Sequence, residues 1–431
     1  MHKRTRIVCT IGPASQKKET LKKMMRAGMN VARLNFSHGT YANHALLVKR
    51  IRAAAREAGL VVTIIQDLQG PRIRLGEITG KVVWKKGQEV VLDGTVSKNT
   101  GRIFPVTYRR LSRDVKKGQR VLIEDGKKEL MVKGVHGNGI TCTVVRGGEI
   151  ISHKGMNFPD SVLKIDPITE KDKKDIVFGL KQGVDYVVMS FVSHGRQIKR
   201  LRRLMGKHAR SVGIIAKVEV AGALKNIAGI IREADGVMIG RGDLALEIDY
   251  ADVPIWQKRI IALCRRAAKP VIVATQMMES MMKGKGALPS RSDVSDVANA
   301  VIDHADAVMT SGETAMGDNP VETVRTMAHI LVEAEASPYD DVLFSTFKKT
   351  DMGVMARRYA EYHGCKAIVI EKSPIEVARL VSHARPELPI IFKSTEAFMR
   401  RLALYWGIDS ALRPKAPHHS LYLVNGNIEL N

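Results

Sequence analysis

Short apolar runs alternate along most of the chain with segments whose apolar residues recur at helical spacing. Eight apolar runs lie at residues 7–11, 30–34, 61–65, 186–189, 212–218, 236–239, 270–274 and 307–309. Helical patterns between them include residues 19–27, 44–58, 169–182, 222–234, 253–268 and 292–303. Strands that are buried on both faces and alternate with helices form parallel sheets. Eight such units predict an α/β protein with a (β/α)₈ barrel. The structural alternative, an open doubly wound sheet, is less favoured because no G-x-G-x-x-G motif follows a strand.

Two segments depart from this rhythm. Residues 71–162 contain short β-rich stretches at 82–84, 89–92, 120–123 and 140–145, separated by turns such as Asp93-Gly94 and Asp125-Gly126. This pattern predicts a small β-barrel lid inserted into the larger barrel, whose two parts are residues 1–70 and 163–336. Residues 337–431 predict a small, shortened α/β domain, with strands at 365–370, 389–392 and 421–424 and helices at 374–384 and 395–406.

The charge balance is unusual. The chain carries 69 Lys and Arg against 44 Asp and Glu, a formal net charge of +25, which favours anionic partners. The densest basic stretch, residues 196–210, has apolar residues at helical spacing and lacks a nucleic-acid-binding motif, so we interpret it as a solvated helix face. Four separated cysteines, no signal peptide and no apolar run near ~18 residues favour a cytoplasmic protein without a membrane span.

Charged side chains follow the apolar runs where a barrel would place its active site. Lys217 and Glu219 are two residues apart on one predicted strand, so they share a side. Glu219 and Asp243 come from adjacent strands and would together bind a hard divalent cation such as Mg²⁺. Lys217 would then stabilise a transferring phosphoryl group. The structural alternative is a salt bridge at the barrel mouth.

A second polar set follows the second and third runs. Arg33 would bind a phosphate group through two guanidinium donors. Asn35, Ser37 and Asp67 would supply oxygens for a weakly held cation, although Asn35 and Ser37 also suit a turn or helix cap. The hydroxyl residues Thr275 and Ser311, after the seventh and eighth runs, suit helix caps as well.

Taken together, these segments resemble the pyruvate kinase family. The motifs are RLNFSHG at 33–39, KVE at 217–219, RGDL at 241–244, ATQMMESM at 274–281, SDVANAV at 295–301 and SGETA at 311–315. They occur in the family's order and span about residues 5–335. The resemblance implies a (β/α)₈ barrel with a β-rich lid after the third strand, and transfer of a phosphoryl group from phosphoenolpyruvate to ADP, giving pyruvate and ATP.

The resemblance also implies a role for each matching residue. Lys217 stabilises the phosphoryl group, and Glu219 and Asp243 bind Mg²⁺ or Mn²⁺. The backbone of Gly242 binds the substrate carboxylate, while Thr275, with Ser311 further along, delivers a proton to the enolate. The residues that match the phosphate and nucleotide side are Arg33, Asn35, His38, Arg74, Asp125 and Lys154. The residues that match the monovalent-cation site are Asn35, Ser37, Asp67 and Leu68.

Arg72 departs from the family pattern, because its position is often Glu in potassium-dependent members and Lys in potassium-independent ones. We therefore expect its guanidinium to replace K⁺. The family's habit implies a homotetramer. Residues 371–376 lack the Gly of the family's sugar-phosphate loop, so we expect no activation by fructose 1,6-bisphosphate there. Two other functions remain open: a metal-dependent aldolase or lyase that acts on pyruvate-like substrates, and a nucleic-acid binder that uses residues 196–210.

Overall fold

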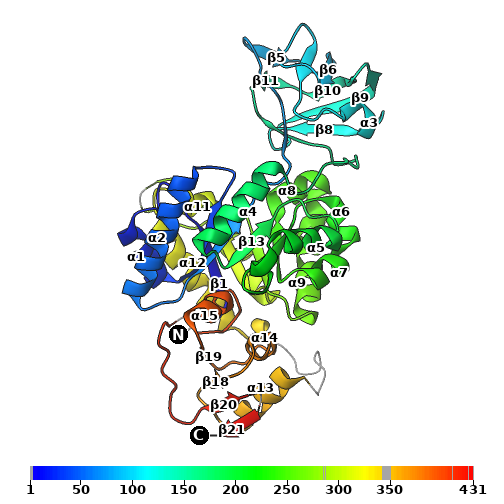
Figure 1. Cartoon of the computed structure of the whole chain (residues 1–431). Helices are drawn as coiled ribbons and strands as arrows, with labels where there is room; N and C mark the ends of the chain where they lie inside the picture. Colours follow the sequence, from blue (N-terminus) through cyan, green and yellow to red (C-terminus); the bar gives the residue numbers. More distant parts are fainter. Residues whose placement is uncertain are drawn as a thin grey trace.

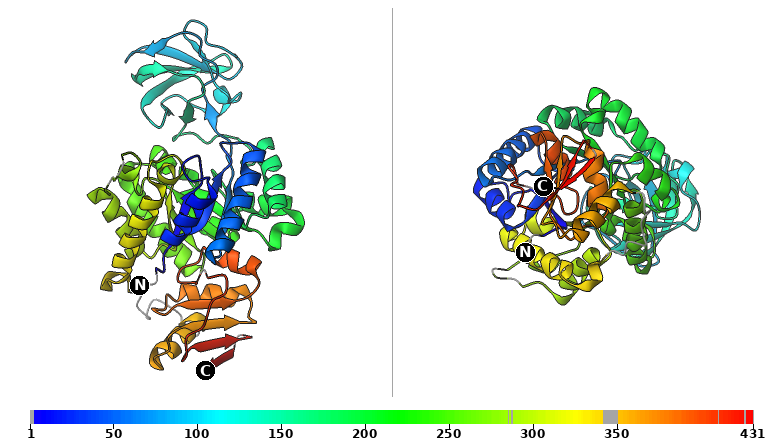
Figure 2. Two further views of the ribbon diagram at one scale, coloured as in Figure 1. Left: turned by 90° about the vertical axis from the view of Figure 1, so that its left-hand side faces the viewer. Right: turned by 90° about the horizontal axis from the view of Figure 1, so that it is seen from below.

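The computed structural model describes residues 3–284, 286, 288–341, 351–409, 411–425 and 427–430. The chain forms three parts stacked along one axis, with the inserted lid at one end of a central barrel and the C-terminal domain at the other (Figures 1 and 2). The barrel strands are β1 (Arg6–Thr10), β2 (Met29–Asn35), β3 (Thr63–Asp67), β13 (Tyr186–Met189), β14 (Gly213–Val218), β15 (Gly236–Gly240), β16 (Val271–Ala274) and β17 (Ala307–Thr310). They close in the parallel order β1-β17-β16-β15-β14-β13-β3-β2, which confirms the predicted (β/α)₈ barrel.

Helices surround the barrel. They are α1 (Lys18–Ala27), α2 (Tyr41–Ala58), α4 (Glu170–Gln182), α5 (Gly195–Leu204), α6 (Ala221–Lys225), α7 (Ile227–Glu233), α8 (Arg241–Glu247), α9 (Val253–Arg266), α10 (Arg291–Ile302), α11 (Gly312–Ala315) and α12 (Pro320–Glu335). Among them, α2, α4 and α10 begin at a residue whose side chain caps the helix. Thr169 and Ser290 form capping boxes at the starts of α4 and α10. The single helix predicted at 222–234 is wrong, because the chain leaves helical geometry at Asn226 (φ −113°, ψ 13°) between α6 and α7.

The interior of the barrel is a packed apolar core. Val8, Val31, Ile65 and Met238, from four different strands, pack together there. Leu404 of the C-terminal domain joins the same cluster and is fully buried. Because the hydroxyl of Tyr186, the first residue of β13, donates to the carbonyl of Arg401 (2.9 Å), the C-terminal domain closes the amino-terminal end of the barrel. The opposite end of the barrel, at the carboxyl ends of the strands, is left available for a functional site.

The lid consists of β4 (Ile73–Arg74), β5 (Val82–Trp84), β6 (Glu89–Asp93), β7 (Ile103–Pro105), α3 (Leu111–Asp114), β8 (Arg120–Ile123), β9 (Lys128–His136), β10 (Gly139–Arg146), β11 (Gly148–Ile150) and β12 (Gly155–Asn157). Seven strands form a sheet in the order β4-β12-β8-β9-β10-β6-β7, with β11 and β5 as a separate ribbon. The sheet closes on itself through a bridge between Leu75 and Val106 and the Thr107 N–H to Arg74 carbonyl bond (2.9 Å). The expected small barrel is therefore present.

The C-terminal domain contains α13 (Met352–Tyr362), α14 (Ile375–His383) and α15 (Glu396–Leu402) around a sheet in the order β19-β18-β20-β21. Its strands are β18 (Ile368–Glu371), β19 (Ile390–Lys393), β20 (Leu421–Val424) and β21 (Asn427–Leu430). The sequence pattern predicted the first three strands and α14, and it missed α13 and β21. The helix expected at 395–406 is shorter than predicted, because α15 ends at Leu402.

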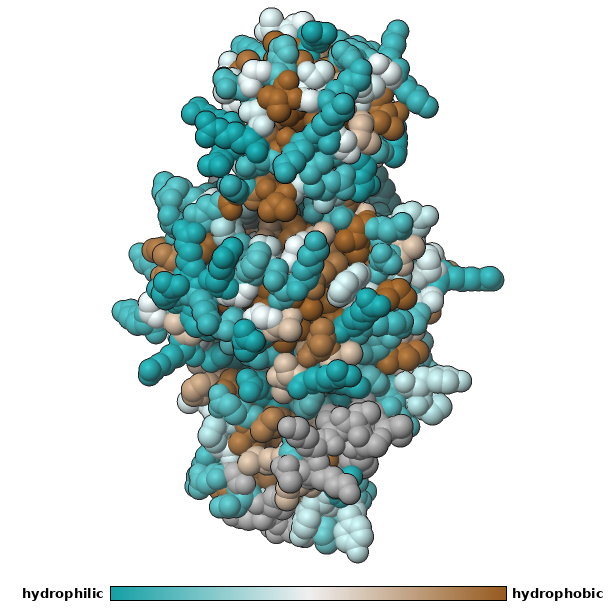
Figure 3. Space-filling view, turned by 90° about the vertical axis from the view of Figure 1, so that its right-hand side faces the viewer, coloured by the Kyte–Doolittle hydropathy of each residue, from teal (hydrophilic) through white to brown (hydrophobic). Residues whose placement is uncertain are grey.

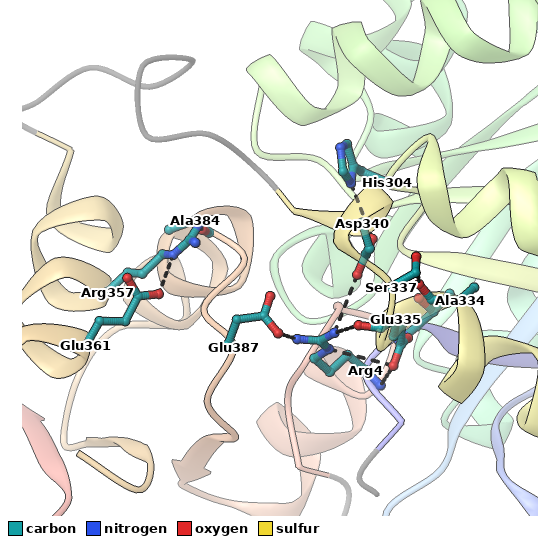
Figure 4. A network of polar contacts seen from close by, with 11 residues as sticks. Arg4, His304, Ala334, Glu335, Ser337, Asp340, Arg357, Glu361, Ala384 and Glu387 are labelled. Carbon is teal, nitrogen blue, oxygen red and sulfur yellow. Dashed lines mark hydrogen bonds and ion pairs between the residues drawn. The ribbon is translucent and has the colours of Figure 1, made fainter. Parts of the chain in front are cut away.

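A buried ion cluster joins the C-terminal domain to the barrel (Figure 4). The guanidinium of Arg4 lies 3.5 Å from Asp340, contacts Glu387 and stacks 5.1 Å over the Trp406 ring. Its backbone N–H donates to Glu335 (2.8 Å). The side chains of Arg4 and Asp340 are 10% and 5% exposed, so their interaction is shielded from solvent and strengthened, whereas Glu387 is half exposed.

The predicted basic helix is present as α5, and its charges are partly used within the barrel. Lys199 pairs with Glu233 (3.3 Å), Arg200 with Asp166 (2.8 Å) and Arg202 with Asp235 (2.8 Å). These pairs favour the structural interpretation of residues 196–210. Figure 3 shows hydrophilic side chains over most of one face of the molecule, with apolar ones gathered across its middle. No helix in the described residues is both long and apolar enough to cross a bilayer.

Candidate active site

The candidate site lies at the carboxyl ends of the barrel strands, on the side of the lid (Figure 1). The lid approaches it closely at the turn between β8 and β9. A Cβ on Gly126 in this turn would lie 3.2 Å from Leu246 Cδ2 of α8, and Gly126 has a φ of +77°. Glycine tolerates both the close approach and the positive φ. The lid turn therefore rests against the helix that begins directly after β15.

Lys217 and Glu219 are the charged pair at the end of β14. Lys217 Nζ lies 2.6 Å from Glu219 Oε1, and both residues are buried. The other carboxylate oxygen of Glu219, Oε2, accepts the Phe191 N–H (3.2 Å), so the buried Oε1 has the Lys217 ammonium as its partner. Gly240 makes room for this carboxylate, because a Cβ there would lie 2.7 Å from Glu219 Cγ.

Burial and charge set the protonation of this pair. Burial raises the pKa of Glu219 to about 7, the charge of Lys217 opposes this shift, and the charge of Asp243 adds to it. Burial would lower the pKa of Lys217, but the charges of Asp67 and Glu219 more than compensate and raise it. Lys217 is therefore a buried ammonium at neutral pH.

Arg33 and Asp67 form the second buried ion pair of the site. Arg33 Nη2 and Nε lie 2.6 and 2.7 Å from Asp67 Oδ2, and Arg33 Nη1 donates to the Thr10 hydroxyl (2.9 Å). Lys217 Nζ lies 3.8 Å from the same oxygen of Asp67. Burial would raise the pKa of Asp67, but Lys217 and Arg33, with a smaller contribution from Arg72, lower it. The structure thus joins Arg33, Asp67 and Lys217, which the sequence analysis assigned to two separate sets, into one charged cluster.

Asp243 and Arg72 face each other across the mouth. Asp243 lies in the first turn of α8, and its Oδ2 is 3.7 Å from Arg72 Nη2. The guanidinium of Arg72 also lies 6.0 Å above the Phe191 ring, at the outer limit of a cation–π contact. Arg72 therefore directs its charge toward the carboxylates of the site.

The loop after β16 is held in place by residues that the sequence did not single out for a role. Thr275 and Gln276 have positive φ values of 71° and 57°. Arg241 donates to the Gln276 carbonyl (3.3 Å) and contacts the Thr275 carbonyl, and Asp296 of α10 fixes its guanidinium at 2.6 and 2.7 Å. The Thr275 hydroxyl then accepts the Gly242 N–H at 3.0 Å.

The donor set fits a hard divalent cation. Glu219 and Asp243 offer carboxylate oxygens, and Oε1 of Glu219 is buried and contacts the Lys217 ammonium. No group of three or more His, Cys, Asp or Glu side chains suited to a metal occurs among the described residues. A cation bound here would complete its coordination with substrate oxygens and water, as Mg²⁺ usually does.

The oxygens predicted for a monovalent cation already have protein donors. Asn35 Oδ1 accepts the Ser37 N–H (3.1 Å), and the Leu68 carbonyl accepts the Ser190 hydroxyl (2.7 Å). Asp67 Oδ2 accepts a hydrogen bond from Arg33 Nε (2.7 Å). Three of the four predicted oxygens, those of Asn35, Asp67 and Leu68, are therefore engaged in internal contacts.

The lid residues form a separate cluster. Lys154 Nζ lies 3.0 Å from Glu124 Oε1, next to the exposed Asp125, and Arg74 Nη1 donates to the His153 carbonyl (2.8 Å). Hydrogen bonds from Lys128, which has the larger effect, and from Lys154 lower the pKa of Glu124 to about 2. The sequence analysis missed Glu124; its place directly before the Asp-Gly turn was the available signal.

His38 and Ser311 lie at the rim. His38 is exposed, and its backbone carbonyl oxygen lies 2.9 Å from Nε2 of His44. Ser311 follows β17, and its N–H donates to Glu313 Oε2 (2.5 Å). The two residues come from opposite sides of the β1 strand, since β17 and β2 both pair with β1. No hydrogen bond or ion pair joins either residue to Lys217 among the described residues.

Comparison with known proteins agrees with this geometry. The family model for the barrel domain of pyruvate kinase matches residues 2–324. The pyruvate kinase of Corynebacterium glutamicum is 40% identical over 419 residues, which cover 96% of this chain and 88% of that protein. The pyruvate kinases of Mycobacterium tuberculosis (38% identical; 96% and 89% covered) and Geobacillus stearothermophilus (40%; 97% and 72%) are also similar. The chain therefore belongs to the pyruvate kinase family.

Proposed function

We propose that the barrel mouth binds phosphoenolpyruvate and ADP together and transfers the phosphoryl group between them at Lys217, giving pyruvate and ATP. The family's activity is phosphoryl transfer, the last step of glycolysis. The observation that carries the assignment to this site is the buried ion pair between the Lys217 ammonium and Oε1 of Glu219, which lie 2.6 Å apart. A buried charge pair of this kind is costly as a purely structural element.

Positive charge is what the reaction requires most. Donor and acceptor bring several negative phosphate oxygens together, and their repulsion must be offset before in-line transfer. Lys217 lies where it would stabilise the moving phosphoryl group, and Arg33, held by Asp67 and Thr10, would bind a phosphate oxygen. The ion pairs that hold Arg33 and Lys217 in the free protein keep these side chains oriented before substrate arrives.

Glu219 and Asp243 would hold Mg²⁺, or Mn²⁺ in its place. Members of this family depend on a divalent metal. The bound cation would neutralise charge on the phosphoryl and carboxylate oxygens of the substrate. Oε1 of Glu219 supplies the buried ligand atom for it. Lys217 would release Oε1 in that state and turn toward the phosphoryl oxygens.

Gly242 and Thr275 would bind the enolate portion. The Gly242 N–H, at the start of α8, points to the Thr275 hydroxyl in the free protein, and a substrate carboxylate would replace that acceptor. The released Thr275 hydroxyl would then deliver a proton toward the methylene carbon of the enolate. Ser311 lies one barrel strand further and would act further along the same proton path.

The nucleotide would lie between the lid and the barrel. Arg74, Lys154 and Asp125 would line the lid side, while Asn35 at the end of β2 and His38 after it would line the barrel side. A lid that closes over ADP would exclude water from the phosphoryl transfer.

Arg72 would take the place of a monovalent cation near the substrate. Its guanidinium lies beside Asp243, and its charge helps to lower the pKa of Asp67. The donors already present on Asn35, Leu68 and Asp67 support this proposal, because they leave those oxygens little capacity for K⁺.

We further propose a cytoplasmic homotetramer. All four cysteines are free and buried, which fits a reducing compartment. Light scattering at micromolar protein would give the mass of the assembly.

The test of the proposed function is pyruvate formation from phosphoenolpyruvate with and without ADP in the presence of Mg²⁺. We expect equal amounts of pyruvate and ATP, and no pyruvate without ADP. Release of pyruvate without ADP would instead indicate a lyase or phosphatase and overturn the proposal.

A further inference from the structure

A small, partly open cavity lies at the junction between the barrel and the C-terminal domain, at the end of the barrel away from the lid. The barrel contributes Arg265 at the end of α9, Lys269 and Asp306. The C-terminal domain contributes Arg379 of α14 and Arg385, which follows this helix. The remaining lining residues are Ala268, Pro270, Ser382, His383 and Tyr405.

The lining is strongly positive. Arg265, Lys269, Arg379 and Arg385 face the cavity with a single carboxylate, that of Asp306, among the described lining residues. Asp306 is already committed, since its Oδ2 accepts the Val271 N–H (2.9 Å) and its Oδ1 the Arg385 guanidinium (2.9 Å). The cavity therefore holds more positive charge than the protein itself neutralises.

Two of the arginines have buried donors that are unused. Arg385 is 5% exposed and its guanidinium stacks 4.7 Å from the Trp406 ring centre, and of its nitrogens only Nη2 is hydrogen-bonded, to Asp306 and to the His304 carbonyl (2.9 Å). Its Nε and Nη1, and the Nε of Arg379, are buried and have no hydrogen-bond partner in the described part of the chain. A buried donor without an acceptor costs free energy, so three such donors at one cavity indicate an acceptor that is absent from the protein chain.

Burial and repulsion among these cations together lower the pKa values of two groups at the cavity, Arg265 and His383. Burial lowers the pKa of Arg265, and the charges of Arg385 and Arg266 lower it further. Burial and then the Arg385 charge lower the pKa of His383 to about 4, so this imidazole is neutral at pH 7. An anion in the cavity would relieve these interactions.

We propose that this junction cavity binds a dianionic phosphate group, either free phosphate or the phosphate of a small monoester. Guanidinium groups pair with phosphate through parallel N–H donors, which matches the unused Nε and Nη1 of Arg385. The enclosed part of the pocket is far smaller than typical ligand pockets of ~300–1,000 Å³, so a bound phosphate would sit at its open mouth and the rest of an ester would lie outside.

The site is separate from the proposed phosphoryl-transfer site. Pro270 and Asp306 directly precede β16 and β17, whose opposite ends lead to Thr275 and Ser311. The cavity and the catalytic mouth thus lie at opposite ends of the same two strands, and loss of one need not remove the other.

Isothermal titration with inorganic phosphate and with methyl phosphate, at constant ionic strength, tests the proposal. The variants are Arg265→Gln and the double variant Arg265→Gln/Arg379→Gln, and the matched control is Arg196→Gln, an exposed arginine of α5. Arg265 makes no ion pair or hydrogen bond that the described structure contains, so its single variant should fold as the wild type does.

We expect the wild type and Arg196→Gln to bind one more phosphate than the double variant, and Arg265→Gln to bind this phosphate at least about tenfold more weakly, a ~1.4 kcal/mol loss. Activity with phosphoenolpyruvate and ADP should persist in the cavity variants. Binding of methyl phosphate would identify monoesters as ligands, whereas binding of inorganic phosphate alone would identify free phosphate. Equal phosphate stoichiometry and affinity in wild type and double variant would overturn the proposal.

Discussion

Lys217 Nζ lies 2.6 Å from Glu219 Oε1 at the carboxyl end of a barrel strand, and both side chains are almost fully removed from solvent. Lys217 also lies 3.8 Å from Asp67, so one ammonium links two carboxylates from different strands. Such a cluster keeps its charges in place without water. It is therefore ready to exchange internal partners for a metal ion and phosphate oxygens.

Replacing Glu219 with Gln should weaken divalent-metal binding. The substitution removes the charge of the buried ligand while keeping an acceptor for the Phe191 N–H. We expect the dissociation constant for Mn²⁺, followed by electron paramagnetic resonance, to rise at least about tenfold. Glu233→Gln, at a carboxylate outside the mouth, is the control. Unchanged Mn²⁺ binding in Glu219→Gln would show that the metal is held elsewhere.

Replacing Arg72 with Glu should create a requirement for K⁺. The wild type should be active in tetramethylammonium buffer, because the Arg72 charge is permanently next to Asp243. In the variant, activity without K⁺ should fall at least about tenfold, which is ~1.4 kcal/mol of barrier, and K⁺ should restore it. The measurement is the rate as a function of K⁺ concentration. A wild type that is strictly K⁺-dependent would refute the substitution of the cation by arginine.

Replacing Asp296 with Asn should misplace the loop of Thr275. Asp296 holds both terminal nitrogens of Arg241, and Arg241 holds the carbonyls of the loop. A displacement near 1 Å can cost about 10²-fold in rate, so we expect a fall in kcat of about ten- to a hundredfold. Thermal unfolding should change little by comparison. A large loss of stability with normal kcat in the folded fraction would assign the pair a purely structural role.

The junction between the barrel and the C-terminal domain should weaken in mild acid. Burial, the charges of Arg385, Arg265 and Arg379, and an opposing effect of Asp351 leave the pKa of His383 at about 4, against 6.5 when unfolded. Between these values the unfolded chain binds more protons, so this contribution to stability is complete above pH 6.5 and is lost as pH falls toward 4. The melting temperature of His383→Gln should therefore fall less steeply over this range.

The comparison in that experiment must be between variant and wild type at each pH, because Asp306 at the same cavity also has a raised pKa, caused by burial. Parallel melting curves for the two proteins from pH 6.5 to 4 would contradict the neutral, buried state of His383.

The sequence predicted the barrel and the charged centre because both depend on local pattern. Apolar runs between helical segments define the strands, and the carboxyl ends of parallel strands converge. Lys217 and Glu219 follow from two-residue spacing alone. This reasoning needs no knowledge of distant contacts.

What the sequence did not reveal depends on contacts between distant residues. Arg241 and Asp296 are 55 positions apart in the sequence. Leu404 belongs to the C-terminal domain but packs into the apolar core inside the barrel. The room that Gly240 leaves for Glu219 is visible only in three dimensions. Hydrophobic periodicity carries no information on any of these contacts, since each depends on how separate elements pack.

The central claim is that the ammonium of Lys217 stabilises the phosphoryl group as it moves from phosphoenolpyruvate to ADP. The most direct measurement is kcat for ATP formation in Lys217→Met, compared with Lys207→Met at an exposed lysine. We predict a loss of about 10²–10³-fold or more for Lys217→Met, as for removal of other groups that stabilise developing charge, and none for Lys207→Met. A folded Lys217→Met variant that forms ATP at the wild-type rate would contradict the account.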